Sequence, residues 1–230
     1  MTEPSPPPAQ RSAQETRATL LEAAATEILE RGYAAASLSS IAAREGLTKG
    51  ALAHQFPAKS DFVAALGDAL QDAVRRSVAG AREAYPDSPT RALIAFLLHL
   101  GARATTDPAV AAATALFSDR AVPGPRLATA VDELLDAIEQ FVAEAQRADD
   151  VEATLPPTDI AEHILITNLG TASFRLHTHA TEPRRPRLRY LRITLKGAGF
   201  PDVDAVIDEV VASHANGTLP TMPPSKSMTR

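Results

Sequence analysis

The segment between residues 48 and 56 combines side chains that can recognise the edges of DNA bases. Helical spacing directs one set of its side chains outward and directs the apolar Leu52 and Phe56 inward. The outward set consists of Lys49, Ala51, His54 and Gln55. Lysine can pair with guanine, glutamine with adenine, and an alanine methyl can contact thymine in the major groove. The segment therefore predicts a base-reading helix, and a surface helix with ordinary polar residues is the alternative interpretation.

Two preceding helices are expected to hold this segment in place. An apolar pattern of helical period runs from Leu20 to Leu29 and stops at Gly32-Tyr33. A short helix is predicted from Ser37 to Glu45, followed by Gly46 and by a second short helix that opens at Thr48. Two short helices joined by a tight glycine turn are typical of a helix-turn-helix DNA reader, whose second helix enters the major groove.

Residues 16 to 62 also resemble the N-terminal domain of the TetR family of transcriptional repressors. The matching pieces are Gly32-Tyr33, Ser37-Leu38, Ile41-Ala42, Gly46 to Leu52, Phe56, and Lys59 followed by Phe62. The resemblance implies DNA contacts by Ser37, Thr48, Lys49, Gly50, Ala51, His54, Gln55 and Lys59. Gly50 would let the helix approach DNA closely, and Ser37 and Lys59 would anchor phosphates. Thr48 can also cap its helix, and for Ser37 a helix cap alone is the alternative.

The chain departs from the family pattern at two places. The family usually has tyrosine after Leu52, where a hydroxyl meets a phosphate, and this chain has Ala53. The family often has histidine just before the closing phenylalanine, and this chain has Gln55, with His54 one place earlier. Each lost phosphate hydrogen bond costs on the order of 1 kcal/mol, so we expect an unusual affinity or sequence preference.

Residues 48–52 and 56–59 are similar to the γ-butyrolactone receptor subgroup, and Phe117 to Pro123 is a weaker second likeness. The resemblance implies an effector site among apolar helices that carry a few polar groups. The expected ligand-binding residues are Phe96, His99, Leu100, Arg103, Phe117, Leu134, Ile138, Phe141, Asn168, Thr171 and Phe174. Core packing is the alternative for the apolar members, whereas a buried polar group needs a partner. The subgroup places a tryptophan against the lactone and this chain has none, so either the ligand differs or lactone binding has been lost.

The remainder of the chain predicts an all-α protein. Helical apolar stripes recur between proline and glycine breaks, and no strand-like alternation of useful length occurs. We expect about nine or ten helices, of which the first three form an N-terminal helix-turn-helix domain and the fourth links it to the body. The expected parts are a disordered tail (1–10), the helix-turn-helix domain (11–58), a helical ligand-binding and dimerisation bundle (59–214) and a second disordered tail (215–230).

Composition restricts the functional classes. The 230 residues include no cysteine, so no disulfide, thiolate metal site or cysteine nucleophile can form. The first ten residues lack the apolar region of a signal peptide, and no apolar run of 18 residues occurs, so we expect a cytoplasmic protein without a membrane span. The net charge is −5, and residues 1 to 60 carry six basic and six acidic side chains. A basic DNA-facing surface must therefore come from the placement of charges.

We expect neither catalysis nor a cofactor. The chain has no HExxH, Ser-His-Asp or phosphate-loop signature. A metal cluster of His163, His177, His179, Glu162 and Glu182 is disfavoured, because two histidines two residues apart point to different faces of a helix. The basic run Arg184, Arg185, Arg187 and Arg189 indicates a solvated loop and helix start, with a second nucleic-acid patch as the alternative.

Together these features predict a ligand-responsive homodimeric repressor that binds a palindromic operator in double-stranded DNA. The family resemblance places the dimer interface on two C-terminal helices, here best matched by Asp159–His177 and Pro201–His214. A small apolar effector, such as a γ-butyrolactone, is expected to release the protein from DNA. The alternative is a divergent TetR-like regulator that no longer binds a lactone and acts through DNA alone or through a partner protein.

Overall fold

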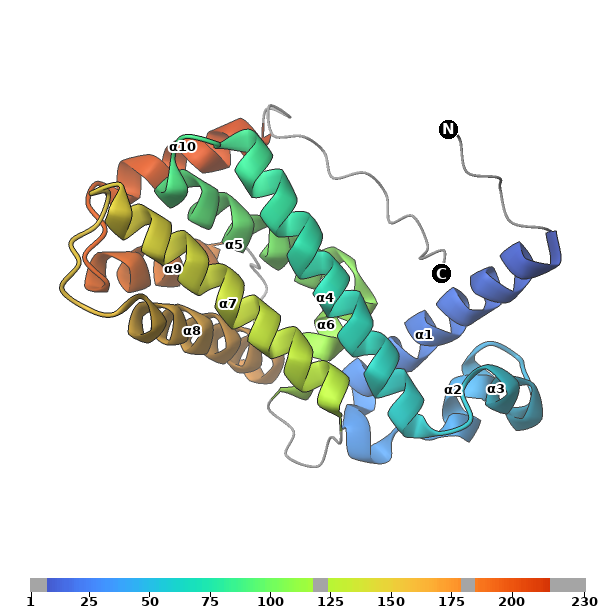
Figure 1. Ribbon diagram of the computed structural model, residues 1–230. Helices are drawn as coiled ribbons and strands as arrows, with labels where there is room; N and C mark the ends of the chain where they lie inside the picture. The colour runs from blue at the N-terminus through green and yellow to red at the C-terminus, as the bar shows by residue number, and fades with distance from the viewer. Residues whose placement is uncertain (1–7, 118–123, 179–184, 216–230) are drawn as a thin grey trace.

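Ten α-helices form the regular structure of the described residues in this computed structural model (Figure 1). The structure describes residues 8–117, 124–178 and 185–215. The helices are α1 (Pro8–Ala35), α2 (Leu38–Arg44), α3 (Lys49–Gln55), α4 (Lys59–Ala84), α5 (Pro89–Thr106), α6 (Pro108–Leu116), α7 (Pro125–Arg147), α8 (Pro157–Thr178), α9 (Arg185–Gly197) and α10 (Val203–Ala215). These three ranges contain no strand, so the predicted all-α fold is confirmed.

The two expected tails fall mostly outside the described residues, at 1–7 and 216–230. The first helix begins at Pro8, inside the segment 1–10 that was expected to be a tail. Proline suits the first position of a helix because the N–H that it lacks would have no partner there. Residues 118–123, which carry most of the weaker likeness to the γ-butyrolactone receptors, also lie outside the described part.

Local chemistry explains where the first helices start and bend. Gly32, at the predicted stop, has φ of 80° and kinks α1 before its last residues. At the start of α2, the Ser37 hydroxyl accepts from the Ser40 backbone N–H at 3.0 Å. The Ser37 N–H in turn donates to the Ser40 hydroxyl, also at 3.0 Å. This reciprocal capping fixes the direction in which α2 leaves the kink.

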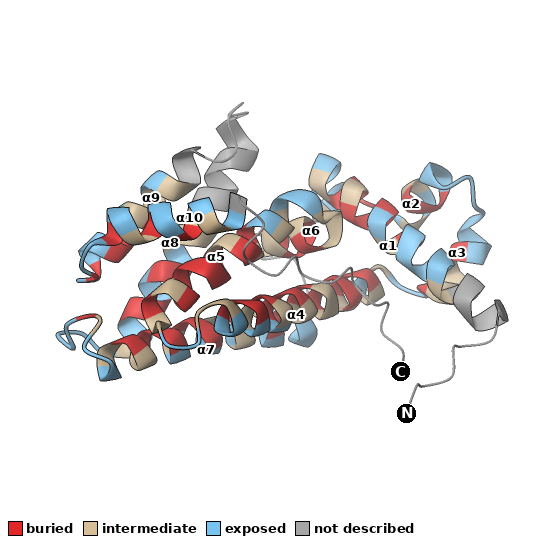
Figure 2. Ribbon diagram, turned by 90° about the horizontal axis from the view of Figure 1, so that it is seen from above, coloured by how far each residue is buried: buried red, intermediate tan, exposed pale blue. Residues whose placement is uncertain are grey.

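Two hydrophobic cores share the helices α1 and α4 (Figure 2). The N-terminal helix-turn-helix part of the chain is called the head here, and the helical bundle after it the body. The head core contains Leu20, Ala23, Ala24, Ile41, Ala42, Leu52, Phe56, Phe62 and Ala65. The body core takes Ala25 and Ile28 from α1 and Val63 and Leu66 from α4. The head core therefore extends past the expected boundary at residue 58. Any rotation of α1 or α4 would disturb both cores, because each helix has neighbouring residues in different cores.

The body is a bundle in which α4 packs against α5, α6 and α7, and α6 packs extensively against α1. The approach between α4 and α7 is close. A Cβ atom at Gly67 would lie 3.0 Å from backbone atoms of Arg126 and Leu127. The Arg126 guanidinium donates to the Asp68 carboxylate at 2.6 Å beside this contact. The half of α4 nearest the head is therefore held directly by the first turn of α7.

The C-terminal helices differ in how much apolar surface they leave open. The apolar residues Val203, Ile207 and Val210 of α10 are buried in the body core, where α10 packs on α5 and α9. These three residues of the α10 stripe that was expected to face a partner thus face the chain's own core, whereas Val206 and Val211 are only partly buried against it. By contrast, Ile166 of α8 is 67% exposed and Ile193 of α9 is 56% exposed. No described helix is long and apolar enough to cross a membrane.

A buried carboxylate fixes α1 to α2 inside the head. The Glu27 side chain is 2% exposed and accepts from Arg44 at 2.9 Å. Arg44 also pairs with Glu30, and Arg31 lies 3.5 Å from the other Glu27 oxygen. The hydrogen bond from Arg44 lowers the pKa of Glu27 below its ordinary value of 4.5, although burial opposes the shift. The ionised form of Glu27 therefore stabilises the folded head.

We predict that this pair makes stability depend on pH in a defined window. A carboxyl whose pKa is lower in the folded state contributes fully above its unfolded value and loses the contribution as the pH falls through its folded value. The unfolding free energy should drop below about pH 4.5, and less so in Glu27→Gln, which should cost about 1–3 kcal/mol at pH 7. Urea unfolding at several pH values measures this, with Glu22→Gln at an exposed α1 position as the control. Identical pH profiles for the parent and Glu27→Gln would contradict the assignment.

Candidate DNA-reading surface and effector region

Helix α3 presents the predicted side chains to solvent. Thr48 caps it, because its hydroxyl accepts from the Ala51 backbone N–H at 3.2 Å. Lys49, Ala51 and His54 are exposed, and Gln55 is half-buried. Leu52 and Phe56 are fully buried in the head core. The outward and inward faces of α3 therefore lie as the helical spacing predicted, with two opposed surfaces on a helix of seven residues.

A three-layer stack holds the C-terminal end of α3. The Arg17 guanidinium of α1 lies 4.1 Å from the centroid of the Phe56 ring. The Phe56 ring stacks on Phe62 of α4, with centroids 4.0 Å apart and an interplanar angle of 19°. Arg17 also donates to the backbone carbonyl of Gln55 at 2.9 Å. Side chains from α1 and α4 thus meet at the residue that ends α3.

The two expected phosphate anchors both have partners within the chain. Ser37 is exposed but its hydroxyl caps α2, so the helix-cap role is present. The Lys59 ammonium lies 4.0 Å from the centroid of the Tyr33 ring and donates to the Ala34 carbonyl at 3.4 Å. Lys59 therefore links the start of α4 to the kinked end of α1, a role that the sequence did not predict. Both side chains remain at the surface of the head.

Gly50 has free space around it. A Cβ atom placed there would meet only the Thr48 hydroxyl, at 3.9 Å, among atoms within 4 Å. Its backbone does not fall in the left-handed region, and glycine lowers helix stability relative to alanine. The fold itself therefore does not require glycine at position 50. A requirement for close approach by something outside the chain would explain this residue.

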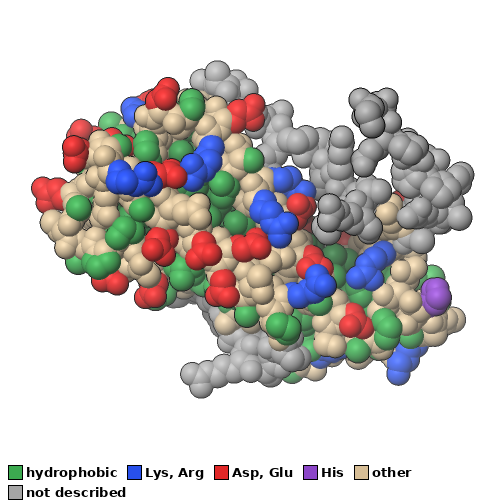
Figure 3. All heavy atoms as spheres, in the orientation of Figure 1, with side chains coloured by type: hydrophobic (Ala, Val, Ile, Leu, Met, Phe, Trp, Pro, Cys, Tyr) green, Lys and Arg blue, Asp and Glu red, His purple; other side chains and the backbone are tan. Residues whose placement is uncertain are grey.

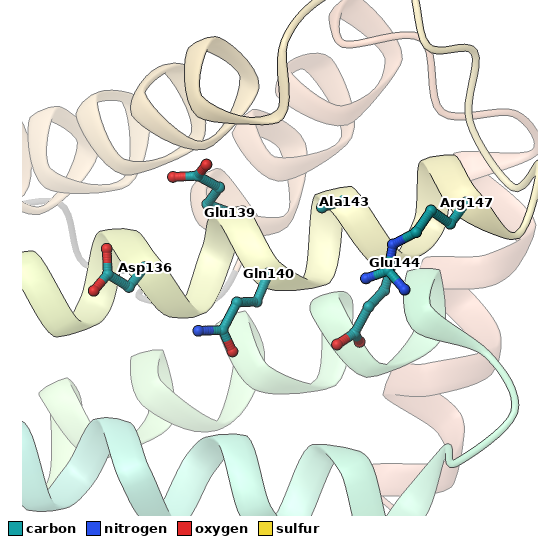
Figure 4. A pocket seen from close by; sticks show the side chains of 6 residues that line it. All are labelled: Asp136, Glu139, Gln140, Ala143, Glu144 and Arg147. Carbon is teal, nitrogen blue, oxygen red and sulfur yellow. The ribbon is translucent and has the colours of Figure 1, made fainter.

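Acidic side chains gather on one face of the body (Figure 3). Asp and Glu side chains run across the face that α4 and α7 form in the body (Figure 3). Asp136, Glu139 and Glu144 of α7, together with Gln140, Ala143 and Arg147, line a surface hollow on this face (Figure 4). In the head, Glu27 and Glu30 are both paired with Arg44. The neutral head can therefore leave Lys49 as an exposed cation on its reading helix.

Most of the apolar residues expected to bind an effector pack into the body core. Phe96 of α5 and Phe141 of α7 are at most 1% exposed, and their ring centroids lie 5.6 Å apart. Ile138 and Leu134 are also buried. Leu100 and Phe117 are partly buried against the same core. Core packing, the alternative interpretation, therefore describes their observed contacts.

Three of the four polar members of the expected set contact different parts of the structure. His99 is 4% exposed, with its ring beside Gly80 of α4 and 5.1 Å from the ring of His214 on α10. Arg103 donates to Asp107 at 3.3 Å at the corner between α5 and α6. The Asn168 amide donates to the Ile164 carbonyl of its own helix at 2.8 Å. Their contacts within the chain thus do not form one shared polar cluster.

Some polar atoms in this region nevertheless have no partner. Among the described residues, His99 Nδ1, Arg103 Nε and the Ser77 hydroxyl are buried without a hydrogen bond. Burial, the neighbouring His214 and an opposing contact with the Ser77 backbone set the pKa of His99 at about 4, so the imidazole is neutral at pH 7. The side chains of Thr171 and Phe174, the last two expected ligand-binding residues, lie outside the described part. Ser77 was not predicted, because one serine on an apolar helix gives no distinguishing signal.

The disfavoured metal cluster also lies partly outside the described part. His179, Glu182 and the side chain of His177 are not described. Within the described part, no group of three or more His, Asp or Glu side chains is arranged to hold a metal ion. The side chains of Arg185 and Arg187 in the basic run are likewise not described, whereas Arg189 is exposed on α9.

Comparison with known proteins identifies the head. Residues 20–66 match the family model described as bacterial regulatory proteins, tetR family. The head is therefore a TetR-type DNA-binding domain. Over 60 residues the chain is 43% identical to the HTH-type transcriptional regulator TtgR of Pseudomonas putida, which is 26% of this chain and 29% of TtgR. This match to the curated relative therefore covers less than a third of that protein's length.

Solved TetR-family structures extend the likeness to the body. CprB of S. coelicolor A3(2) is 26% identical, with a TM-score of 0.72 over 87% of this chain and 97% of its own. A structure described as a gamma-butyrolactone receptor (ArpA-like protein) is 24% identical, with a TM-score of 0.68 over 89% of this chain and 98% of its own. The second likeness concerns the fold alone. The chain thus has the helix-turn-helix head and helical body of TetR-family regulators.

Two features of the TetR-type head were missed by the sequence analysis. Glu27 had a detectable signal, because it falls among the apolar residues Ala23, Ala24 and Ile28, where an unpaired charge would be costly. Arg17 had none, because its partners at positions 55 and 56 are distant in the chain and no spacing rule connects them.

The space around Gly50 generates a prediction that separates folding from DNA reading. Gly50→Ala should leave the protein as stable as the parent or more stable, by up to about 1 kcal/mol, because alanine favours the helix. The added methyl on the exposed face should weaken binding to the preferred DNA duplex. Thermal unfolding and fluorescence anisotropy with labelled duplex measure the two effects. A variant that binds DNA as tightly as the parent would show that this face does not approach DNA.

Proposed function

We propose that the protein is a homodimeric repressor that reads a palindromic operator with α3 and leaves DNA when a small, largely apolar effector binds its body. The observation that carries the proposal is the exposed polar face of α3 on a head whose position is fixed by helices shared with the body. The proposal requires neither a cofactor nor a catalytic step. Two heads about 34 Å apart would read half-sites in successive major grooves.

DNA reading is supported by the side chains that α3 exposes. Lys49 and Gln55 have the donors to pair with guanine and adenine, and Ala51 can contact a thymine methyl. The hydroxyl of Thr48, the backbone at Gly50 and the side chains of Ser37 and Lys59 are the proposed phosphate or close-approach contacts. A CprB structure described as a complex with its biological operator sequence is 27% identical, with a TM-score of 0.71.

We expect substitutions on this surface to have different effects on sequence preference. Selection from a random DNA pool should yield a defined sequence with the parent, and Gln55→Ala should change which bases are preferred. Lys59→Ala should weaken all duplexes about equally and reduce the salt dependence by about one counterion, since a phosphate contact carries no base information. Lower thermal stability with an unchanged salt dependence would instead limit Lys59 to its contacts with Tyr33 and Ala34. No enriched sequence from the parent would refute DNA reading.

Dimerisation is supported by the open apolar positions of the C-terminal helices. Ile166 and Ile193 are more than half exposed on α8 and α9, which pack against one another. Large exposed apolar side chains on adjacent helices are typical of a surface covered by another chain. Leu169, in the same expected interface, already packs partly against the body core. We therefore place the centre of the interface on α8 and α9 rather than on α8 and α10.

Ile166→Asp should convert the dimer to a monomer, because a charge buried in an apolar interface is costly without a partner. Sedimentation velocity measures the change, and Ile193→Asp should have the same effect. Glu162→Gln, an exposed α8 position, controls for a general effect of surface substitution. A dimer of unchanged mass in both isoleucine variants would place the interface elsewhere.

Effector binding is supported by the buried polar atoms that lack partners. Arg103 Nε and His99 Nδ1 lie on successive turns of α5, a helix whose other buried residues are mainly apolar. An effector with one or two oxygen acceptors, such as a lactone, furan or butenolide, could accept from Arg103. The Asp107 carboxylate that pairs with Arg103 also caps α6, and α6 packs on α1 of the head. A ligand that engages Arg103 can shift DNA affinity only if it binds the two states unequally.

Arg103→Ala should abolish effector-induced release while sparing DNA affinity, because the effector would lose its charged donor. Release of labelled operator by lactones and furans tests this, with Arg75→Ala, an exposed arginine on α4, as the control. Release of Arg103→Ala at the parent's effector concentration would remove Arg103 from the site.

Two observations favour a second candidate function. The chain lacks tryptophan, and the aromatic rings of Phe96 and Phe141 fill the core between α5 and α7. These features favour a divergent regulator that binds no lactone and acts through DNA alone or through a partner protein. In that case, no lactone would release the parent protein from its selected duplex.

A further inference from the structure

The end of α3 needs partners from outside the helix. The last four carbonyls of any α-helix have no intrahelical partner, and in a helix of seven residues they are more than half of its carbonyls. The Phe56 N–H donates to the Leu52 carbonyl. The Gln55 carbonyl receives its hydrogen bond from a side chain outside the helix. That side chain is Arg17, which donates to the Gln55 carbonyl at 2.9 Å. A cation is also favoured at a helix C-terminus by the helix dipole.

The same arginine is held over an aromatic ring that cannot move freely. Its guanidinium lies 4.1 Å from the centroid of Phe56, which is 0% exposed. Phe56 is stacked on Phe62, the residue through which α4 enters the head core. The planar guanidinium can stack on the ring and donate to the carbonyl at the same time, whereas a lysine ammonium has no planar group to stack.

Gln55 and His54 are the last outward residues of α3, next to this clamp. Because Arg17 binds the backbone carbonyl of Gln55, it restricts the direction in which the Gln55 side chain leaves the helix. We infer that Arg17 is a positioning residue for DNA recognition, which sets the orientation of the last turn of α3 and thereby the base preference of Gln55. This inference rests on the proposed reading of DNA by α3.

A rival role for Arg17 is direct contact with a phosphate, since its side chain lies at the surface of the head. The two roles differ in what they predict. A phosphate contact weakens binding of every duplex and lowers the salt dependence by about one counterion. A positioning residue affects mainly the preferred duplex, because only that duplex depends on the orientation of Gln55.

The test uses the full-length protein and the duplex that the parent selects from a random pool, with a random duplex for comparison. Arg17→Ala should weaken the selected duplex about tenfold, because DNA binding must then order the end of α3 that one cation–π contact and one hydrogen bond hold in the parent. The random duplex should weaken about twofold or less, with an unchanged salt slope. Arg17→Lys should partly restore the preference. Arg31→Ala is the control, because it removes the same charge roughly 21 Å further along α1. It should leave the affinity for both duplexes at the parent value.

A second selection with Arg17→Ala should show weaker preference at the bases that Gln55→Ala also changes. Hydrogen exchange should show faster exchange of the α3 amides in this variant while the rest of the head remains protected. Equal weakening of both duplexes with a reduced salt slope would assign Arg17 to phosphate contact and overturn the inference. Parent-like preference in Arg17→Ala would also overturn it. If the parent itself selects no sequence, the proposed function fails instead.

Discussion

The division of α1 and α4 between two cores is the constraint on which this structure depends. Phe62 packs in the head core, while the next residue, Val63, packs in the body core. On α1, Ala24 and Ala25 are divided in the same way. Close packing leaves such helices few alternative positions, so neither helix can shift without disturbing both cores. The contact of α4 with α7 at Gly67 and that of α6 with α1 are the places where the body holds these helices.

The reading helix depends on its neighbours for both stability and direction. A helix as short as α3 is not stable alone, so its order comes from tertiary contacts. Its buried face contributes Leu52 to the head core, and the Arg17–Phe56–Phe62 stack fixes its end to both shared helices. The exposed face of α3 therefore does not contribute to packing, as the free space around Gly50 shows. Its side chains are available for recognition without cost to the fold.

Sequence periodicity predicted the helices and the faces of α3 well, because local spacing decides both. The break at Gly32 and the caps at Ser37 and Thr48 were also readable from residue types, although the break is a kink within α1 and not its end. Contacts between distant segments were not readable. The position of Lys59 over Tyr33, the carbonyl bound by Arg17 and the pairing of Arg103 with Asp107 depend on tertiary packing. The same limit applies to α10, where Val203, Ile207 and Val210 match a dimer stripe in sequence but are buried in the chain's own core. The effector residues were the least predictable, because a pocket wall and a packed core have the same composition.

Hydrogen exchange of the protein with and without its selected duplex tests the central claim most directly, because amide protection reports where the DNA lies. The account predicts added protection in α3 and around the start of α2, with no change on the exposed faces of α8 and α9. Protection centred on α9, where the exposed Arg189 follows the basic run, and none in α3 would contradict it.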